Sequence, residues 1–144
     1  MFRLTRRYRF SASHRLHSPL LSEAENARIY GKCNNPYGHG HNYILHVSAL
    51  GPAGGADGRV LNPRMLDDFV AREILDRLDH QNLNCDVEWF EGRVPTSENL
   101  GMEICRRLKR GWKNAFPGEW PRFEKVCIEE TARNIFEIDA DEIA

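Results

Sequence analysis

The stretch FRLTRRYRFSAS, residues 2–13, alternates apolar and polar side chains along most of its length. Three of the four arginines fall on odd positions, and the large apolar side chains fall on the even positions Phe2, Leu4, Tyr8 and Phe10. A period of two is typical of a β-strand that buries one face and exposes the other. The stretch therefore predicts a first strand whose even-numbered face packs on a core.

Three further segments have the composition of strands. NYILHVSAL, residues 42–50, is rich in β-branched and apolar side chains, and the glycine-rich GPAGGADG that follows it predicts a loop. Near the end of the chain, FEKVCIEET (123–131) and IFEID (135–139) are separated only by ARN. This arrangement predicts a closing hairpin.

Two amphipathic helices are predicted between these pairs of strands. Asn62 followed by Pro63 has the pattern of an N-cap and a first helical residue. Apolar residues then recur at three- and four-residue spacing, at Leu66, Phe69, Val70, Ile74 and Leu78. In residues 95–116, Thr96 or Ser97 is the predicted cap, and the apolar stripe is Leu100, Ile104, Leu108 and Trp112. The order predicts an α+β fold, with two helices on one face of a four-stranded antiparallel sheet.

The composition limits the possible classes of function. The chain has 144 residues, which predicts a single domain over 1–144, and 20 basic against 21 acidic side chains give no reason to expect nucleic-acid or membrane partners. No signal peptide or membrane-spanning stretch is recognisable, so we expect a soluble, cytoplasmic protein. The four cysteines form no CxxC pair, which argues against disulfides and cysteine-based zinc fingers.

Histidines in YGKCNNPYGHGHNY, residues 30–43, indicate a metal site. In an extended segment, His39 and His41 project to the same side and can bind one ion, although this pair alone fits two surface histidines equally well. His14, at the end of the first predicted strand, is the candidate third ligand. His17 is the competing third ligand, and His46 would face the other side of the strand. Three histidines with an open fourth position are typical of a catalytic zinc site.

Four other residues are candidates for chemistry. Cys33 lies among turn residues that can fold its thiol back toward a metal, whereas the other three cysteines fit the role of buried thiols. Asp79 and His80 are expected at the end of the first helix, where a helix C-terminus favours a protonated imidazole; a solvated pair is the alternative. Glu130 shares a strand face with apolar residues, so we expect a partly buried carboxylate that a ligand can satisfy.

Five motifs occur in one order: FSASHRLHS, GKCNNPYGHGHNY, LDHQNL, PTSEN and EET. From residue 10 to residue 138 the chain thereby resembles the 6-pyruvoyl-tetrahydropterin synthases. The resemblance implies the tunnelling fold, in which three ββααββ subunits form a twelve-stranded barrel, two trimers stack into a homohexamer, and sites lie at subunit interfaces.

The same resemblance implies an activity and a role for each candidate residue. The implied reaction converts 7,8-dihydroneopterin triphosphate to 6-pyruvoyl-tetrahydropterin and triphosphate, for tetrahydrobiopterin-type biosynthesis. It implies Zn²⁺ held by His14, His39 and His41. It further implies Cys33 as the general base, Asp79 and His80 as the pair that tunes and relays its proton, and Glu130 as the pterin anchor.

Two alternatives stay open at this point. The 6-carboxy-tetrahydropterin synthases of queuosine synthesis share the HGH and DH motifs, but they typically place the cysteine closer to HGH. Here five residues separate Cys33 from His39, the interval of the pyruvoyl enzymes, and this interval favours the pyruvoyl product. A non-catalytic protein that binds zinc and pterin is the second alternative, and it predicts uptake without product.

Overall fold

One mixed sheet organises the computed structural model, which describes residues 1–144. Its strands are β1 (Phe2–His14), β2 (His39–Gly51), β3 (Gln81–Asn82), β4 (Arg122–Glu129) and β5 (Ile135–Asp139), in the spatial order β3-β1-β2-β4-β5. The four predicted strands are present and antiparallel to their neighbours. The prediction of a four-stranded sheet is corrected by β3, a two-residue strand that runs parallel to β1 beside Ala12 and Ser13.

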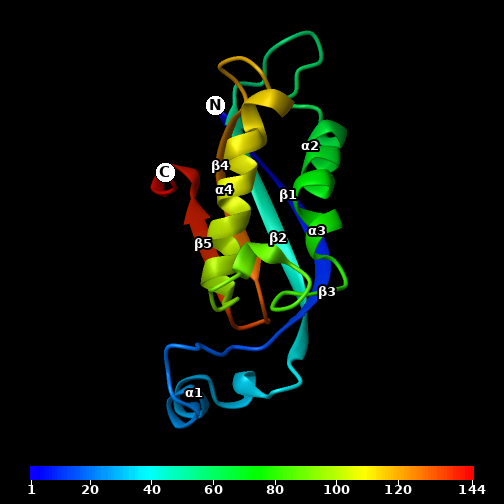
Figure 1. Cartoon of the computed structure of the whole chain (residues 1–144). Coiled ribbons are helices and arrows are strands. Elements are labelled where there is room, and N and C mark those ends of the chain that lie inside the picture. The colour runs from blue at the N-terminus through cyan, green and yellow to red at the C-terminus, as the bar shows by residue number, and fades with distance from the viewer.

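The two predicted helices lie on the same face of this sheet (Figure 1). The first is made of three consecutive pieces, α2 (Pro63–Val70), a π-helical turn (Ala71–Leu75) and α3 (Asp76–Leu78). The second is α4 (Ser97–Ala115), with short 3₁₀ turns at Gly31–Asn34, Glu88–Phe90 and Ala140–Glu142 elsewhere in the chain. Both predicted caps are confirmed, because the side chains of Asn62 and Thr96 accept backbone hydrogen bonds at the helix starts.

A further helix, α1 (Glu23–Tyr30), was not predicted from the sequence. It belongs to the segment that connects β1 to β2 and lies beyond the end of the sheet, away from α2 and α4 (Figure 1). Ser22 and Glu25 form a capping box at its start. The β1–β2 ladder pairs His14 with His39, so the two ends of this connecting segment lie next to each other.

The core lies between the sheet and the helices α2 and α4. The even-numbered residues Phe10 and Ala12 of β1 are buried, as are Tyr43, Leu45 and Val47 of β2. The predicted helical stripes are also buried. The odd-numbered residues of β1 up to Arg9 are exposed on the opposite face, so the alternation read from residues 2–13 predicted the correct face.

No helix in the structure combines the length and apolar character that crossing a membrane requires.

Candidate active site and metal centre

Three histidines converge where the β1–β2 ladder ends. The antiparallel register runs from Phe2 opposite Gly51 to His14 opposite His39, and His41 lies two residues along β2 on the same face. One ring nitrogen from each of the three lies within 4.8 Å of the others. The Nε2 atoms of His14 and His39 are 3.1 Å apart. The structure thus brings together the three residues that the sequence nominated as metal ligands.

The donor atoms of this cluster fit a metal ion. Nδ1 of His39 and Nε2 of His41 are buried and have no hydrogen-bond partner, which is costly unless another species satisfies them. Burial lowers the pKa of His14 to about 4 and lowers the pKa of His41 as well. These imidazoles are consequently neutral at pH 7, the form that binds metals. Three imidazoles with ring nitrogens close to one another are a suitable donor set for zinc.

A backbone carbonyl orients His14. Its Nδ1 lies 2.8 Å from the carbonyl oxygen of Pro95, the residue before the N-cap of α4. Nδ1–H donates to this oxygen, which leaves the Nε2 lone pair directed at the other two histidines. This contact was not predictable from the sequence, because the acceptor is a main-chain atom 81 positions away.

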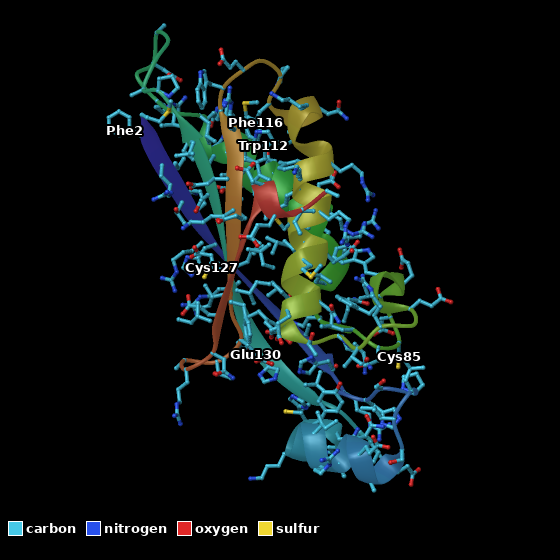
Figure 2. The ribbon with its side chains drawn as sticks, turned by 90° about the vertical axis from the view of Figure 1, so that its left-hand side faces the viewer. Phe2, Cys85, Trp112, Phe116, Cys127 and Glu130 are labelled. Atoms are coloured by element: carbon cyan, nitrogen blue, oxygen red, sulfur yellow. The ribbon has the colours of Figure 1, made fainter.

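The predicted carboxylate reaches the same cluster. Glu130 follows β4 directly, and its Oε1 lies 3.5 Å from Nε2 of His41 and 3.8 Å from Nε2 of His14. Figure 2 shows Glu130 at the end of β4 that points toward α1. The side chain is 13% exposed, and the apolar residues Val126 and Ile128 that share its face are buried. The predicted face was correct, and it directs the carboxylate into the site.

Cys33 is held near the cluster but is not a member of it. Its carbonyl oxygen accepts a hydrogen bond of 2.8 Å from the amide of Leu16, so the turn folds this segment back onto the chain after β1. Burial raises the pKa of the Tyr43 hydroxyl, and the charges of Glu130 and Cys33 raise it further. Both groups therefore act on Tyr43, which lies two residues beyond His41 on the same face of β2.

His17, the competing third ligand, lies outside the histidine cluster. Its Nδ1 lies 3.0 Å from Nδ2 of Asn34. Nδ2 of Asn34 also donates to the carbonyl oxygen of Leu16. His46 points to the other side of β2, as expected, and pairs with Glu129. Neither residue completes the metal site.

Asp79 and His80 form an oriented pair directly after α3. Oδ1 of Asp79 lies 3.1 Å from Nδ1 of His80 and also accepts a 2.9 Å hydrogen bond from the amide of Ser11. The amide of His80 donates to the carbonyl oxygen of Ser11, and its φ of 61° lies in the left-handed region. The His80 side chain is 82% exposed. Strand β1 therefore holds this ring so that its Nε2 faces solvent.

The pair and the cluster are separate within one chain. No hydrogen bond or ion pair joins His80 to the three histidines, to Cys33 or to Glu130. One cavity beside His80 is also lined by His41, so the two groups border the same cavity without contacting each other. The sequence placed both groups at strand and helix ends, but it did not show that they are not in contact within one chain.

The chain is similar to known proteins along almost its whole length. Residues 3–141 match the family model described as 6-pyruvoyl tetrahydropterin synthase. The chain is similar to the 6-pyruvoyl tetrahydrobiopterin synthase of Drosophila melanogaster, 45% identical over 92% of this chain and 76% of that protein. It is also similar to the protein of that name from Homo sapiens, 45% identical over 74% of each chain.

Solved structures show the same fold. The 6-pyruvoyl tetrahydropterin synthase of Caenorhabditis elegans superposes with a TM-score of 0.85 at 40% identity, covering 96% of this chain and 94% of that one. A Plasmodium vivax structure of that name superposes with a TM-score of 0.68 at 16% identity, over 96% of each chain. At that level of identity, the likeness concerns the fold alone.

Proposed function

Because the chain belongs to the 6-pyruvoyl tetrahydropterin synthase family, we propose that it is a zinc-dependent lyase of tetrahydrobiopterin-type biosynthesis. Its substrate is 7,8-dihydroneopterin triphosphate, and its products are 6-pyruvoyl-tetrahydropterin and inorganic triphosphate. The observation that carries the proposal is the convergence of three histidines and the Glu130 carboxylate at one end of the sheet.

His14, His39 and His41 would hold the zinc ion. The 3.1 Å approach of Nε2 of His14 to Nε2 of His39, the unpartnered Nε2 of His41 and the His14–Pro95 hydrogen bond support this assignment. When bound, zinc supplies Lewis-acid stabilisation of the negative charge that develops on a side-chain oxygen of the substrate. The protein's part is to hold this donor set in a buried position.

Glu130 would bind the pterin ring. A carboxylate accepts two hydrogen bonds from the adjacent ring N–H and amino groups, and this planar match fixes the orientation of the ring. Because Oε1 of Glu130 lies 3.5 Å from His41, a ring bound there has its side chain beside the metal centre. The Glu130 side chain is only 13% exposed, which limits the access of water that would compete for these hydrogen bonds.

Cys33, Asp79 and His80 would move protons. As a thiolate, Cys33 removes a proton from a side-chain carbon of the substrate, and His80 takes part in its exchange. Asp79 accepts from Nδ1–H of His80, so Nε2 carries the lone pair that receives a proton. Electrons from the side chain then reduce the ring, and triphosphate leaves by elimination.

A second copy of the chain would complete this site. His80 faces solvent and does not contact the cluster of its own chain, so the His80 that serves Cys33 comes from a neighbour. Both outer edges of the sheet are open for strand pairing, since β5 has no outer partner and β3 covers only two residues of β1. Pairing these edges closes a barrel from three copies, and two such trimers give the expected hexamer.

We place the enzyme in the cytoplasm. All four cysteines are free thiols, which supports a reducing compartment.

Product identification tests the proposed reaction. Zinc-loaded protein is incubated anaerobically with 7,8-dihydroneopterin triphosphate, and the pterin product is identified by mass spectrometry. We expect a pyruvoyl side chain and released triphosphate. A carboxyl group with acetaldehyde would instead assign the queuosine-type reaction, and unchanged substrate would favour the role of a binding protein.

A further inference from the structure

Two cavities flank the exposed ring of His80 on the face of the sheet opposite the core. One, of about 480 Å³, is lined by polar side chains and by Asp86, and apart from histidine it has no side chain that can be positive. The other, of about 390 Å³, is lined by Arg9, Phe10, Ser11, Asn42, Asp79 and His80. The second cavity therefore places an arginine beside His80, whereas the first, which His41 also lines, contains no arginine or lysine.

Arg9 is a cation with no partner in the chain. Arg3 and Arg6, on the same strand, are held by Glu124 and Asp67. Arg9 makes no hydrogen bond or ion pair, and its side chain is exposed on the outward face. A free guanidinium beside an oriented histidine can give its full fork of N–H donors to a ligand.

We propose that Arg9 binds the phosphate groups of the substrate, an inference that rests on the proposed function. In the substrate, the triphosphate is attached to the carbon next to those that exchange protons. If His80 exchanges these protons, the phosphates enter the cavity that His80 shares with Arg9. The guanidinium can donate two parallel hydrogen bonds to one phosphate group. These hydrogen bonds stabilise the negative charge that increases on the triphosphate as it leaves.

Arg7 provides a matched control. It lies two residues before Arg9 on the same face of β1, is also exposed and has no ion-pair partner, but it does not line the cavity with His80. If phosphate binding depended only on the positive charge of this face, replacing either arginine would weaken it equally. Only a direct contact between Arg9 and the phosphate makes the two replacements differ.

The test measures the binding of inorganic tripolyphosphate to the full-length, zinc-loaded protein by calorimetry at constant ionic strength. We expect Arg9→Gln to weaken binding roughly tenfold, Arg9→Lys to weaken it less, and Arg7→Gln to change it by less than about twofold. Zinc content is measured before and after, because tripolyphosphate binds metals. Binding of 7,8-dihydroneopterin, which has no phosphate, should be the same in all four proteins.

Equal weakening by Arg9→Gln and Arg7→Gln would overturn the inference in favour of a diffuse electrostatic effect, and so would unchanged binding in Arg9→Gln. The proposed function is tested separately by the product of the wild-type protein. A pyruvoyl product together with unchanged tripolyphosphate binding in Arg9→Gln removes only the role of Arg9. If tripolyphosphate binding is weakened only in Arg9→Gln and the wild-type protein forms no pyruvoyl product, only the assigned reaction is contradicted.

Discussion

Each ligand of the histidine cluster depends on neighbours that fix its ring. His14 is completely buried, and the Pro95 carbonyl holds its Nδ1. His39 and His41 are positioned by the regular backbone of β2, on either side of Gly40. The cluster is therefore preorganised, and the loss of one imidazole removes one of its three nitrogen donors.

Replacing His39 tests the metal site directly. His39→Ala should lose most of its bound zinc, because two imidazoles give a much weaker site than three. Zinc per chain is measured by elemental analysis after dialysis. The control is His46→Ala, a histidine on the same strand whose side chain faces Glu129 on the other face, and it should keep its zinc. Equal zinc in the two variants would contradict the assignment.

Residue-scale features were predictable from the sequence where they follow from strand geometry. His14, His39 and His41 were nominated because the end of one strand and the start of the next are natural neighbours, and the structure pairs them. The orienting contact from Pro95 was not predictable. It depends on how α4 packs against the sheet, and a carbonyl oxygen carries no signature in the sequence.

At the scale of elements, α4 is joined to the segment before it through one carboxylate. Glu103, 9% exposed, pairs with Arg106 and Arg107 on its own helix and with Arg93. Burial alone would raise the pKa of Glu103, but the charge of Arg107 and hydrogen bonds from Arg106 and Arg93 outweigh it and lower the pKa. This carboxylate stays ionised and stabilises the fold at neutral pH.

The lowered pKa predicts a pH-dependent loss of stability. A depressed carboxyl pKa contributes stability above the ordinary glutamate value of 4.5, and the contribution is lost as the pH falls below it toward the folded-state pKa. At pH 7, Glu103→Gln should lower the free energy of unfolding by about 2 kcal/mol. The difference from wild type should shrink in acid, as urea unfolding at several pH values will show.

The control for this experiment is Glu91→Gln, which removes an exposed carboxylate that has no ion pair. It should change the free energy of unfolding by less than about 0.5 kcal/mol at any of these pH values. A difference between Glu103→Gln and wild type that stays constant with pH would mean that ionisation of Glu103 does not stabilise the fold.

The elements that sequence reasoning missed are those without an apolar pattern. Helix α1 buries only Asn26, so no hydrophobic period marks it, although the capping box at Ser22 and Glu25 was a usable signal. Strand β3 has two residues, too few to show any period.

The predicted helix α4 contains Gly101, where an added Cβ would lie 2.6 Å from Ile138, so the glycine allows close packing on β5.

At the scale of the whole molecule, the residues of the proposed site form two groups that do not contact each other within one chain. Cys33 and the histidine cluster lie at the end of the ladder, whereas His80 faces solvent beside Arg9. The sequence supplied the residues of both groups but not their separation. Which face a side chain after a helix occupies depends on how that helix packs, and no local pattern encodes it.

This separation predicts complementation between inactive chains. Cys33→Ala and His80→Ala should each have little activity, because general acid–base groups contribute roughly 10²–10⁴-fold to the rate. If the subunits are unfolded together and refolded as a mixture, sites with one intact residue from each parent should restore up to about a quarter of wild-type turnover. Variants refolded separately and then combined serve as the control. No gain in the co-refolded mixture would place both residues in one chain's site.

The open edges of the sheet also affect the behaviour of the protein in solution. A folded but unassembled chain presents the outer backbone of β5, and most of that of β1, to any extended peptide. The tendency of this chain to aggregate can therefore change without any change in the free energy of unfolding. If the chain assembles as proposed, a substitution that weakens assembly exposes these edges while each subunit is still native, and light scattering together with circular dichroism distinguishes the resulting aggregation from unfolding.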